Sequence, residues 1–481
     1  MSESVTQQAP LESPLEKKDA LNEVDAQSVA SEPAAPSQSK PHWYRSTFTQ
    51  ATILGMCSFL APGVWAAMNS LGAGGQSSPA TVNAANALTF VLMIFTSWAT
   101  SSLINLTSVP ITLSIGTTGF AVYAAGLYLS TKTAGTTTWL VLVGAACCGI
   151  SAGFFWSTEG AVILSYPEKD RLGRYVSYWL MFRVLGQLVG GVINLALNYS
   201  AAQAGSISLE TYGVFIALQC LGPFVALTLS RPEKVQRKDG TKVVLNLEGS
   251  VKSELKAVGK LLCRREVALL LPMIWQTTFS ESLVGTYAAT YFTVRSRALG
   301  SLLSAVVASL GNYALGFYLD TKRVSVNKRG KSAFIFVYAC QGGWWIFSLI
   351  VLNRLHRNKP AEPFDWASSG FSTHFALYIM LQLGFNQMYE LTYWLVSAIN
   401  KDGSEIVRLA SIVRGVESAG QALSYGINAT SWRLDAVAGL NFGLYSLCLA
   451  PAWVVIRKVG EGGRLAAIAS EEGNKDGDAK E

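Results

Sequence analysis

Charged residues are scarce in this sequence. Asp, Glu, Lys and Arg together make up 14% of its 481 residues, whereas 50% of the chain is hydrophobic. A soluble domain usually carries about 25% charged residues. The shortage excludes an ordinary soluble protein and indicates a membrane protein.

Residues that carry most enzyme and metal chemistry are also few and scattered. The three histidines, His42, His356 and His374, lie far apart, and the seven cysteines fall almost wholly within apolar runs at no metal-ligand spacing. No nucleophile stands at a useful spacing from a base. The "GAGG" at residues 72–75 follows no predicted strand, which argues against a nucleotide-binding loop. We expect no catalytic residues, no metal and no cofactor, and we interpret the cysteines as small core residues.

Aromatic residues are almost absent from the first forty positions, which are rich in Ser, Ala, Pro and Glu. Such a stretch buries too little apolar surface to fold, so we predict that residues 1–44 form a disordered tail. It has no apolar core of a secretory signal, and we expect no cleaved signal peptide. Residues 458–481 are predicted to form a second disordered tail.

Long apolar runs fill the rest of the chain. A helix needs about twenty apolar residues to cross about 30 Å of hydrocarbon, and twelve such runs can be placed, six on each side of a polar stretch. The predicted spans are 47–68, 81–104, 109–130, 138–165, 175–198, 212–230, 267–292, 299–319, 333–352, 373–399, 405–429 and 437–456. The sequence predicts an all-α membrane protein with twelve transmembrane helices in two six-helix halves, residues 45–230 and 266–457, joined by a linker at 231–265.

Lys and Arg are distributed unequally between the connections. They are dense between the fourth and fifth spans, in the linker, and between the eighth and ninth spans, but scattered in the remaining loops. Because positively charged loops stay in the cytosol, we predict that both termini are cytosolic. The net charge of +7 is interpreted as this topology signal at the lipid bilayer, and no nucleic-acid partner is expected. The plasma membrane and an endomembrane are both compatible with the sequence.

The linker contains the segment "EGSVKSELKAVGKLL". Val251, Leu255, Val258 and Leu262 share one helical stripe, with lysines one position further on. This pattern predicts an amphipathic basic helix. Two interpretations are open: the helix lies on the inner leaflet, or it packs on its own bundle.

A carboxylate and an arginine recur inside the two halves. Glu159 in the fourth span and Arg183 in the fifth are matched, at a constant offset of 231 residues, by Glu390 in the tenth and Arg414 in the eleventh. The helical rise puts Glu159 about 10 Å and Arg183 about 14 Å from the loop that joins their spans, so an ion pair is predicted in each half. These pairs either lock neighbouring helices together or take part in proton or substrate coupling.

One carboxylate has no such repeat. Glu281 lies in "WQTTFSESLVGTYAATYF" of the seventh span, among polar residues that include Gln276. A carboxylate inside a membrane is a functional-site hypothesis by default, and structural glue is the alternative. Glu417, three residues after Arg414, is predicted to share that arginine on one helix face.

Small residues recur in "GQLVGG" of the fifth span. Gly186 and Gly190 have the GxxxG spacing that lets helix backbones approach closely. We predict a packing role for both glycines.

The six-plus-six arrangement and two loops resemble the major facilitator superfamily. "YPEKDRLGRYVSYW", which contains Arg171, is similar to that family's Pro-x-x-x-Arg-x-Gly turn between spans four and five. "GFYLDTKRVSVNKRG", with Asp320, Lys322 and Arg323, is similar to its Gly-x-x-x-Asp-x-Arg gating loop between spans eight and nine. The corresponding first-half segment "SSLINLTSVP" departs from the pattern, because it has neither the acid nor the bases.

Within that superfamily the chain resembles the Unc-ninety-three-like branch, in particular its fungal members. The resemblance covers about residues 45–460. It implies twelve helices around a central cavity lined mainly by spans one, four, seven and ten, so that Glu159, Glu281 and Glu390 fall on cavity helices. It also implies an alternative to transport, because animal relatives act as regulators of ion channels or as escorts of receptors.

Together these features predict a secondary transporter that moves a small solute or ion by alternating access, with coupling to an ion gradient because no ATP-binding motif is present. The candidate substrate or proton-coupling residues are Glu281, Glu159, Arg183, Glu390, Arg414, Gln276 and Glu417. The candidate cytosolic gating residues are Asp320, Lys322, Arg323 and Arg171. The alternative is a non-transporting regulator or trafficking partner of another membrane protein.

Overall fold

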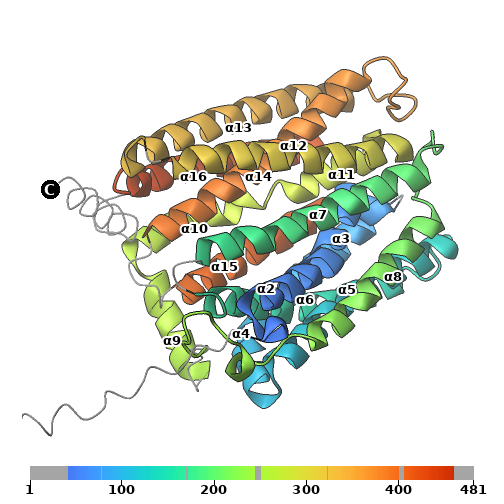
Figure 1. The fold of residues 1–481 in the computed structure, drawn as a ribbon. Helices are drawn as coiled ribbons and strands as arrows, with labels where there is room; N and C mark the ends of the chain where they lie inside the picture. The colour runs from blue at the N-terminus through green and yellow to red at the C-terminus, as the bar shows by residue number, and fades with distance from the viewer. Residues whose placement is uncertain are drawn as a thin grey trace, which may run out of the picture. The chain divides into compact units, whose positions relative to one another are not determined.

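The computed structural model describes residues 42–76, 78–168, 172–243, 251–321, 323–399 and 406–459, and the chain from His42 onward belongs to one compact unit. The predicted tails lie almost wholly outside the described residues. Apart from isolated bridges, the described residues form helices and their connections (Figure 1).

Twelve long helical segments occupy the described part of the chain. The first six are a broken helix of α2 (Thr47–Ser58), η2 (Phe59–Gly63) and α3 (Val64–Ser70), followed by α4 (Pro79–Leu106), α5 (Val109–Lys132), α6 (Trp139–Ser165), α7 (Leu172–Asn198) and α8 (Leu209–Leu227). The second six are a broken helix of α10 (Arg265–Thr277) and α11 (Glu281–Tyr291), followed by α12 (Val294–Asp320), α13 (Val326–Arg357), α14 (Phe371–Ile399), α15 (Ile406–Asn428) and α16 (Leu434–Ile456). Each segment lies where an apolar run predicts it, and the fold class is confirmed.

Ten of these segments, counted among the described residues, are long and apolar enough to cross a membrane by themselves. The other two are α14 and α15. Helix α14 carries Glu390, and α15 carries Arg408, Arg414 and Glu417, which lower the mean hydropathy of these two helices. The side chains that make α14 and α15 less apolar include the candidate site residues.

The first span of each half is interrupted near its middle. In the first half, η2 is a π-helical segment that contains Pro62, which has no N–H to donate to the preceding turn. In the second half, α10 ends at Thr277 and α11 begins only at Glu281. Interrupted helices in corresponding positions of two repeats are typical of the binding site in secondary transporters.

Helix α7 packs closely on the interrupted first span. A Cβ added at Gly186 would lie 2.6 Å from the carbonyl oxygen of Phe59 and 2.9 Å from the Cα of Gly63, and one added at Gly190 would lie 2.4 Å from the Cβ of Ala67 on α3. No side chain fits between backbones at that separation. These two glycines therefore allow α7 to lie directly against η2 and α3.

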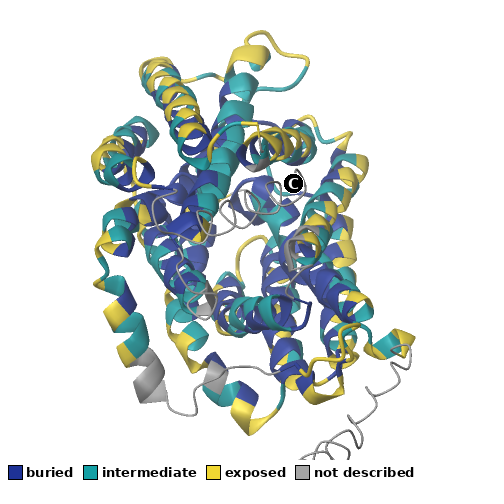
Figure 2. Ribbon diagram, turned by 60° about the vertical axis from the view of Figure 1, so that its left-hand side comes forward, coloured by how far each residue is buried: buried dark blue, intermediate teal, exposed yellow. Residues whose placement is uncertain are grey.

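The two halves meet along two pairs of helices, α4 with α15 and α7 with α12. The outward helix faces carry many exposed residues (Figure 2). Among them are large apolar side chains, such as Tyr313 and Phe317 on α12 and Leu447 on α16, which are 76%, 72% and 72% exposed. Apolar surface of this kind is stable against lipid rather than water. The described chain is therefore a multi-pass membrane protein.

Helix α9 (Val251–Leu262) forms in the linker, where the amphipathic pattern predicts a helix. It contacts α4, α10 and α15. Leu261 is buried, and Val258 and Leu262 pack against the apolar core of the second half. The last turns of this helix thus pack on the bundle, in agreement with the second of its two interpretations.

Candidate functional site: a cavity between the two halves

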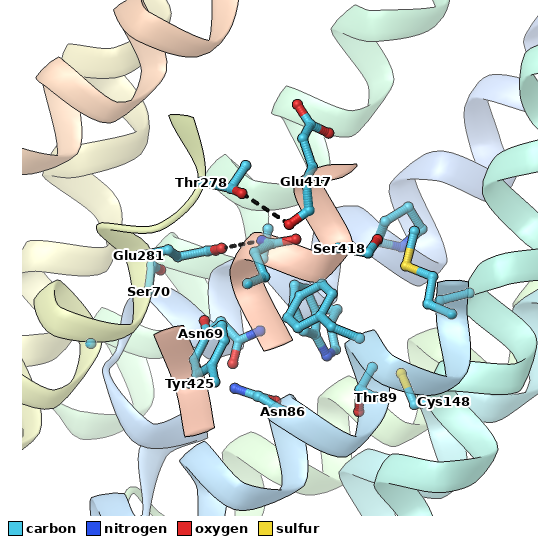
Figure 3. A pocket seen from close by; sticks show the side chains of 18 of the residues that line it. Asn69, Ser70, Asn86, Thr89, Cys148, Thr278, Glu281, Glu417, Ser418 and Tyr425 are labelled. Carbon is cyan, nitrogen blue, oxygen red and sulfur yellow. Dashed lines mark hydrogen bonds between the residues drawn. The ribbon is translucent and has the colours of Figure 1, made fainter. Parts of the chain in front are cut away.

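A cavity lies between the halves (Figure 3). Its walls come from α3, α4, α5, α6 and α7 of the first half and from α11, α14 and α15 of the second, together with Pro62 of η2 and Thr278 of the second interruption. Carboxamides from both halves line it: Asn69, Asn83, Asn86, Gln187, Gln382, Asn386 and Gln421. Four charged residues face it as well: Arg183, Glu281, Arg414 and Glu417.

Glu281 is the first residue of α11, directly after the interruption of the seventh span. Its Oε2 accepts a hydrogen bond of 2.7 Å from Nε2 of Gln421, and Oγ1 of Thr278 donates to the carbonyl oxygen of Glu417 at 3.3 Å (Figure 3). The interruption thereby turns a carboxylate into the cavity and ties it to α15. Gln276, the other candidate on this span, is buried on α10 and is not among the residues that line the cavity.

Two arginines, one from each half, lie over the same indole ring. The guanidinium carbons of Arg183 and Arg414 are 5.0 Å and 4.3 Å from the ring centroid of Trp156 on α6. Cations are attracted to the negative face of an aromatic ring at such distances. Trp156 therefore joins the halves electrostatically at the cavity wall.

Arg414 has a carboxylate partner within its own helix. Its Nη1 lies 3.3 Å from Oε2 of Glu417, as the spacing of three residues predicts, and the hydroxyl of Tyr393 donates to the same oxygen at 3.1 Å. Tyr389 and Tyr393 also face the guanidinium, with ring centroids at 5.7 Å and 5.5 Å. Arg414 thus lies in an aromatic cage that is closed by one acid.

The predicted ion pair between Glu159 and Arg183 is wrong for the described structure. Oε1 of Glu159 instead accepts hydrogen bonds from the hydroxyl of Ser58 and from Nε1 of Trp179, the latter at 2.7 Å. Trp179 precedes Arg183 by one helical turn on α7. The difference of about 4 Å between the two predicted depths is close to one turn of helix, so the indole meets the carboxylate and Arg183 reaches the cavity.

The second predicted pair, Glu390 with Arg414, is also wrong, because the carboxylate that pairs with Arg414 is Glu417. Glu390 lies against α12, where its Oε1 is 2.8 Å from the position that a Cβ at Gly316 would take. The repeat therefore places the same residue types at matching positions without giving them the same partners.

The candidate gating loops are described only in part. Asp320 ends α12 and Arg323 is exposed just after it, whereas Lys322 and Arg171 lie outside the described residues. Arg329, one of the basic residues between the eighth and ninth spans, donates to the carbonyl of Thr321 and so closes this loop on itself.

We call the end of the bundle that carries the linker the linker end, and the opposite end the distal end. At the distal end Arg297 of α12, only 2% exposed, binds backbone carbonyls of the first half. Its Nε donates to Leu71 at 2.6 Å, Nη2 to Gly72 at 2.7 Å and to Gln76 at 3.2 Å, and Nη1 to Gly205 at 2.9 Å. In the sequence, Arg297 is one of the lysines and arginines scattered among the remaining loops, and no local pattern marks this role.

Other bonds also cross between the halves at the distal end. The hydroxyls of Ser70 and Ser301 lie 2.6 Å apart, the hydroxyl of Tyr378 donates to the carbonyl of Ser70 at 2.7 Å, and Nδ2 of Asn83 donates to the carbonyl of Asn428 at 3.0 Å. Hydrogen bonds thus hold the halves together beyond the cavity at this end.

At the linker end, two arginines of the linker each donate a hydrogen bond to one half. Nε of Arg237 donates to the carbonyl of Tyr166 in the first half at 3.1 Å, and Nη2 of Arg264 donates to the carbonyl of Ile399 in the second half at 2.5 Å. Helix α9 of the linker contacts α4 of the first half and α10 and α15 of the second, so the linker also lies against both halves at this end.

Arg295, two residues before Arg297, serves only its own half through its side chain. Its Nε donates to Oδ1 of Asp365, in the loop before α14, at 2.6 Å, and its Nη2 donates to Oδ2. Its guanidinium carbon lies 4.7 Å from the ring centroid of Trp366. The hydrogen bonds from this guanidinium lower the pKa of Asp365 to about 2.

Comparison with known proteins agrees with this architecture. Residues 47–357 match the Major Facilitator Superfamily. The chain is 45% identical over 426 residues to the notoamide biosynthesis cluster protein O' of Aspergillus versicolor, covering 88% of this chain and 92% of that protein. It is 29% identical over 394 residues to an UNC93-like protein of Schizosaccharomyces pombe, with 79% and 76% covered, and 27% identical over 407 residues to UNC93-like protein 1 of Arabidopsis thaliana, with 83% and 88% covered.

A solved structure shares the fold. The partially occluded inward open conformation of the xylose transporter XylE from E. coli aligns with a TM-score of 0.61 at 12% identity, covering 85% of this chain and 97% of that one. At that identity the likeness concerns the arrangement of helices alone.

Proposed function

The chain belongs to the major facilitator superfamily, a family of transporters rather than enzymes, and on this basis we propose that it moves a small solute or ion across a membrane by alternating access. The observation that carries the proposal is the cavity, which lies between halves that are joined by hydrogen bonds at the distal end. Substrate sites between repeats, with one end closed at a time, are the basis of alternating access.

The positively charged linker end is assigned to the cytosol in this proposal. Arg237, Arg264 and Arg329 all lie there, and positively charged loops remain on the cytosolic side. The described state is then inward-facing, with both termini in the cytosol and with Arg297 closing the outer end. The loop with Asp320, Lys322 and Arg323, and the turn with Arg171, would meet across the inner end in the opposite state.

Glu281 is the residue that we place first for substrate or proton binding. It lines the cavity, and within the described residues it has an amide partner and no cation within 4 Å. A carboxylate in a membrane cavity needs a proton or a cationic ligand to be stable there. Exchange of Glu281 between the two would couple the solute to a proton gradient.

A small organic compound is the first class of solute to test, since the relative that is 45% identical is a notoamide biosynthesis cluster protein. Flux should be measured in reconstituted vesicles with an imposed proton gradient, for the wild type and Glu281→Gln. Glu210→Gln is the matched control, because Glu210 is exposed at the start of α8.

Gradient-dependent flux that Glu281→Gln abolishes and Glu210→Gln preserves is the expected result. Absence of flux across a broad solute panel, together with copurification of one stoichiometric membrane protein, would replace transport by the role of a regulator or trafficking partner.

A further inference from the structure

We propose that the cavity selects a dipolar aromatic solute, one that carries a carboxylate at one end and a protonated amine at the other. The inference deepens the proposed function. It rests on that function only for the movement of the solute across the membrane, because selective binding can be measured without flux. It is carried by two buried donors without a hydrogen-bond partner on one wall of the cavity and by a carboxylate without a cationic neighbour within 4 Å on the opposite wall, among the residues that the structure describes.

The wall from the first half presents donors. Nε1 of Trp65 and Nδ2 of Asn69 are buried in the cavity lining without a hydrogen-bond partner, and they lie one turn apart on α3. Arg183 adds a guanidinium that rests on Trp156 and has no carboxylate within 4 Å among the described residues. Buried donors in native proteins are nearly always satisfied, so this wall is complementary to an anionic group rich in acceptor oxygens.

The wall from the second half presents acceptors. Glu281 has Gln421 as its hydrogen-bond donor but no cationic neighbour within 4 Å among the residues that the structure describes. The arginine of this wall, Arg414, is already matched by Glu417. The net demand here is for a positive charge, which a protonated amine supplies at Glu281.

Aromatic rings from both halves line the cavity as well. Phe90 of the first half stacks on Tyr425 of the second with centroids 5.6 Å apart, and Phe120, Trp156 and Phe385 also line the cavity. Tyr425, Asn69 and Asn86 lie in the same part of the cavity lining (Figure 3). Rings of this kind favour flat, aromatic ligands, so the lining is complementary to an aromatic solute.

Three probes test each charge separately, because all share the indole ring. Tryptophan carries both charges, tryptamine lacks the carboxylate, and indole-3-propionate lacks the amine. Binding of each should be measured by calorimetry to the purified full-length protein in lipid nanodiscs. We expect tryptophan to bind at least about tenfold more tightly than either of the other probes, which corresponds to the binding free energy of one charge-assisted hydrogen bond.

Two variants then assign the charges to residues. Arg183→Gln should weaken binding of tryptophan and indole-3-propionate and leave tryptamine unchanged. Glu281→Gln should weaken binding of tryptophan and tryptamine and leave indole-3-propionate unchanged. Arg295→Gln, outside the cavity, is the control and should change none of the three.

Equal binding of the three probes by the wild type, or no binding of any probe at millimolar concentration, would overturn the inference without any variant. A preference for tryptophan that survives both Arg183→Gln and Glu281→Gln would overturn it equally. If the predicted order of binding is found but vesicles show no flux, the cavity is a ligand site and only the proposed transport is refuted. If vesicles transport other solutes and the predicted order of binding is not found, only this inference is refuted.

Discussion

Removal of the Arg297 side chain should open the distal end. Its guanidinium belongs to the second half, and all four of its carbonyl acceptors, including those of Leu71 and Gly205, belong to the first. The contact therefore exists only while the halves are closed at this end. Taking one partner from a buried charged contact costs about 3–5 kcal/mol.

The expected change in population follows from that figure. Since about 1.4 kcal/mol is a factor of ten, the ratio of distal-closed to distal-open molecules should fall by about 100-fold or more in Arg297→Gln. A protein that is 99:1 in favour of the closed state would then reach about equal populations or beyond. Arg297→Lys, which offers a point charge instead of a planar fork with five donors, should fall between the two.

Electron–electron resonance between two spin labels reads these populations directly. The labels are placed at Thr136→Cys and Glu362→Cys, exposed positions in the α5–α6 and α13–α14 loops of the distal end, on a background without the native cysteines. The wild type should give one short distance, and Arg297→Gln should add a longer one. Arg295→Gln is the matched control, because its side chain binds Asp365 within the same half.

A single unchanged distance in correctly folded Arg297→Gln would refute the assignment of Arg297 as the distal closure. An equal change in Arg295→Gln would show that any arginine in this region acts on the loops rather than on the contact between the halves.

Three further results are expected. Glu159→Leu should lower the thermal unfolding temperature more than Glu159→Gln does, because the amide still accepts from Trp179; equal losses would mean that this hydrogen bond contributes nothing. Gly186→Ala should reduce the yield of folded protein in size-exclusion chromatography, since its Cβ has no space, whereas Gly213→Ala, with nothing within 4 Å of the new Cβ, should not; similar yields would argue against the close approach of α7. The pKa of Asp365 is lowered to about 2 in the folded protein, so its contribution to stability is present above its ordinary pKa near 3.8 and is lost as the pH falls towards 2. Asp365→Asn should therefore lower the unfolding temperature at pH 7 but much less at pH 2. A difference in unfolding temperature that is constant with pH would contradict this.

The spans were predictable because a single physical quantity, the length of apolar sequence, decides them. Helices α14 and α15 were found for the same reason, even though their charged residues lower the mean hydropathy. The interruption of the first span had a signal in Pro62, which the sequence analysis did not use. The break before Glu281 has no comparable residue, since Thr278, Phe279 and Ser280 are common within helices.

Partners inside the bundle were less predictable than positions. The sequence singled out Glu281, which lines the cavity, and the pairing of Arg414 with Glu417. A lone carboxylate and a spacing of three residues are both local features of the chain. The prediction failed for Glu159 because partner choice between neighbouring helices depends on depth within one turn, which a count of residues from a loop does not resolve. Trp65 and Asn69 on α3 were missed because an apolar run does not reveal which face is turned to a cavity.

Arg297 was missed for a different reason, which has a consequence for this protein's relatives. Its acceptors are main-chain oxygens, and every amino acid supplies one. The contact itself does not use the side chains of its acceptor residues; they matter only where the backbone path requires glycine, as at Gly72 and Gly205 with their positive φ. A search for pairs of positions that change together during evolution would therefore find no pair here, because only Arg297 contributes a side chain to the contact.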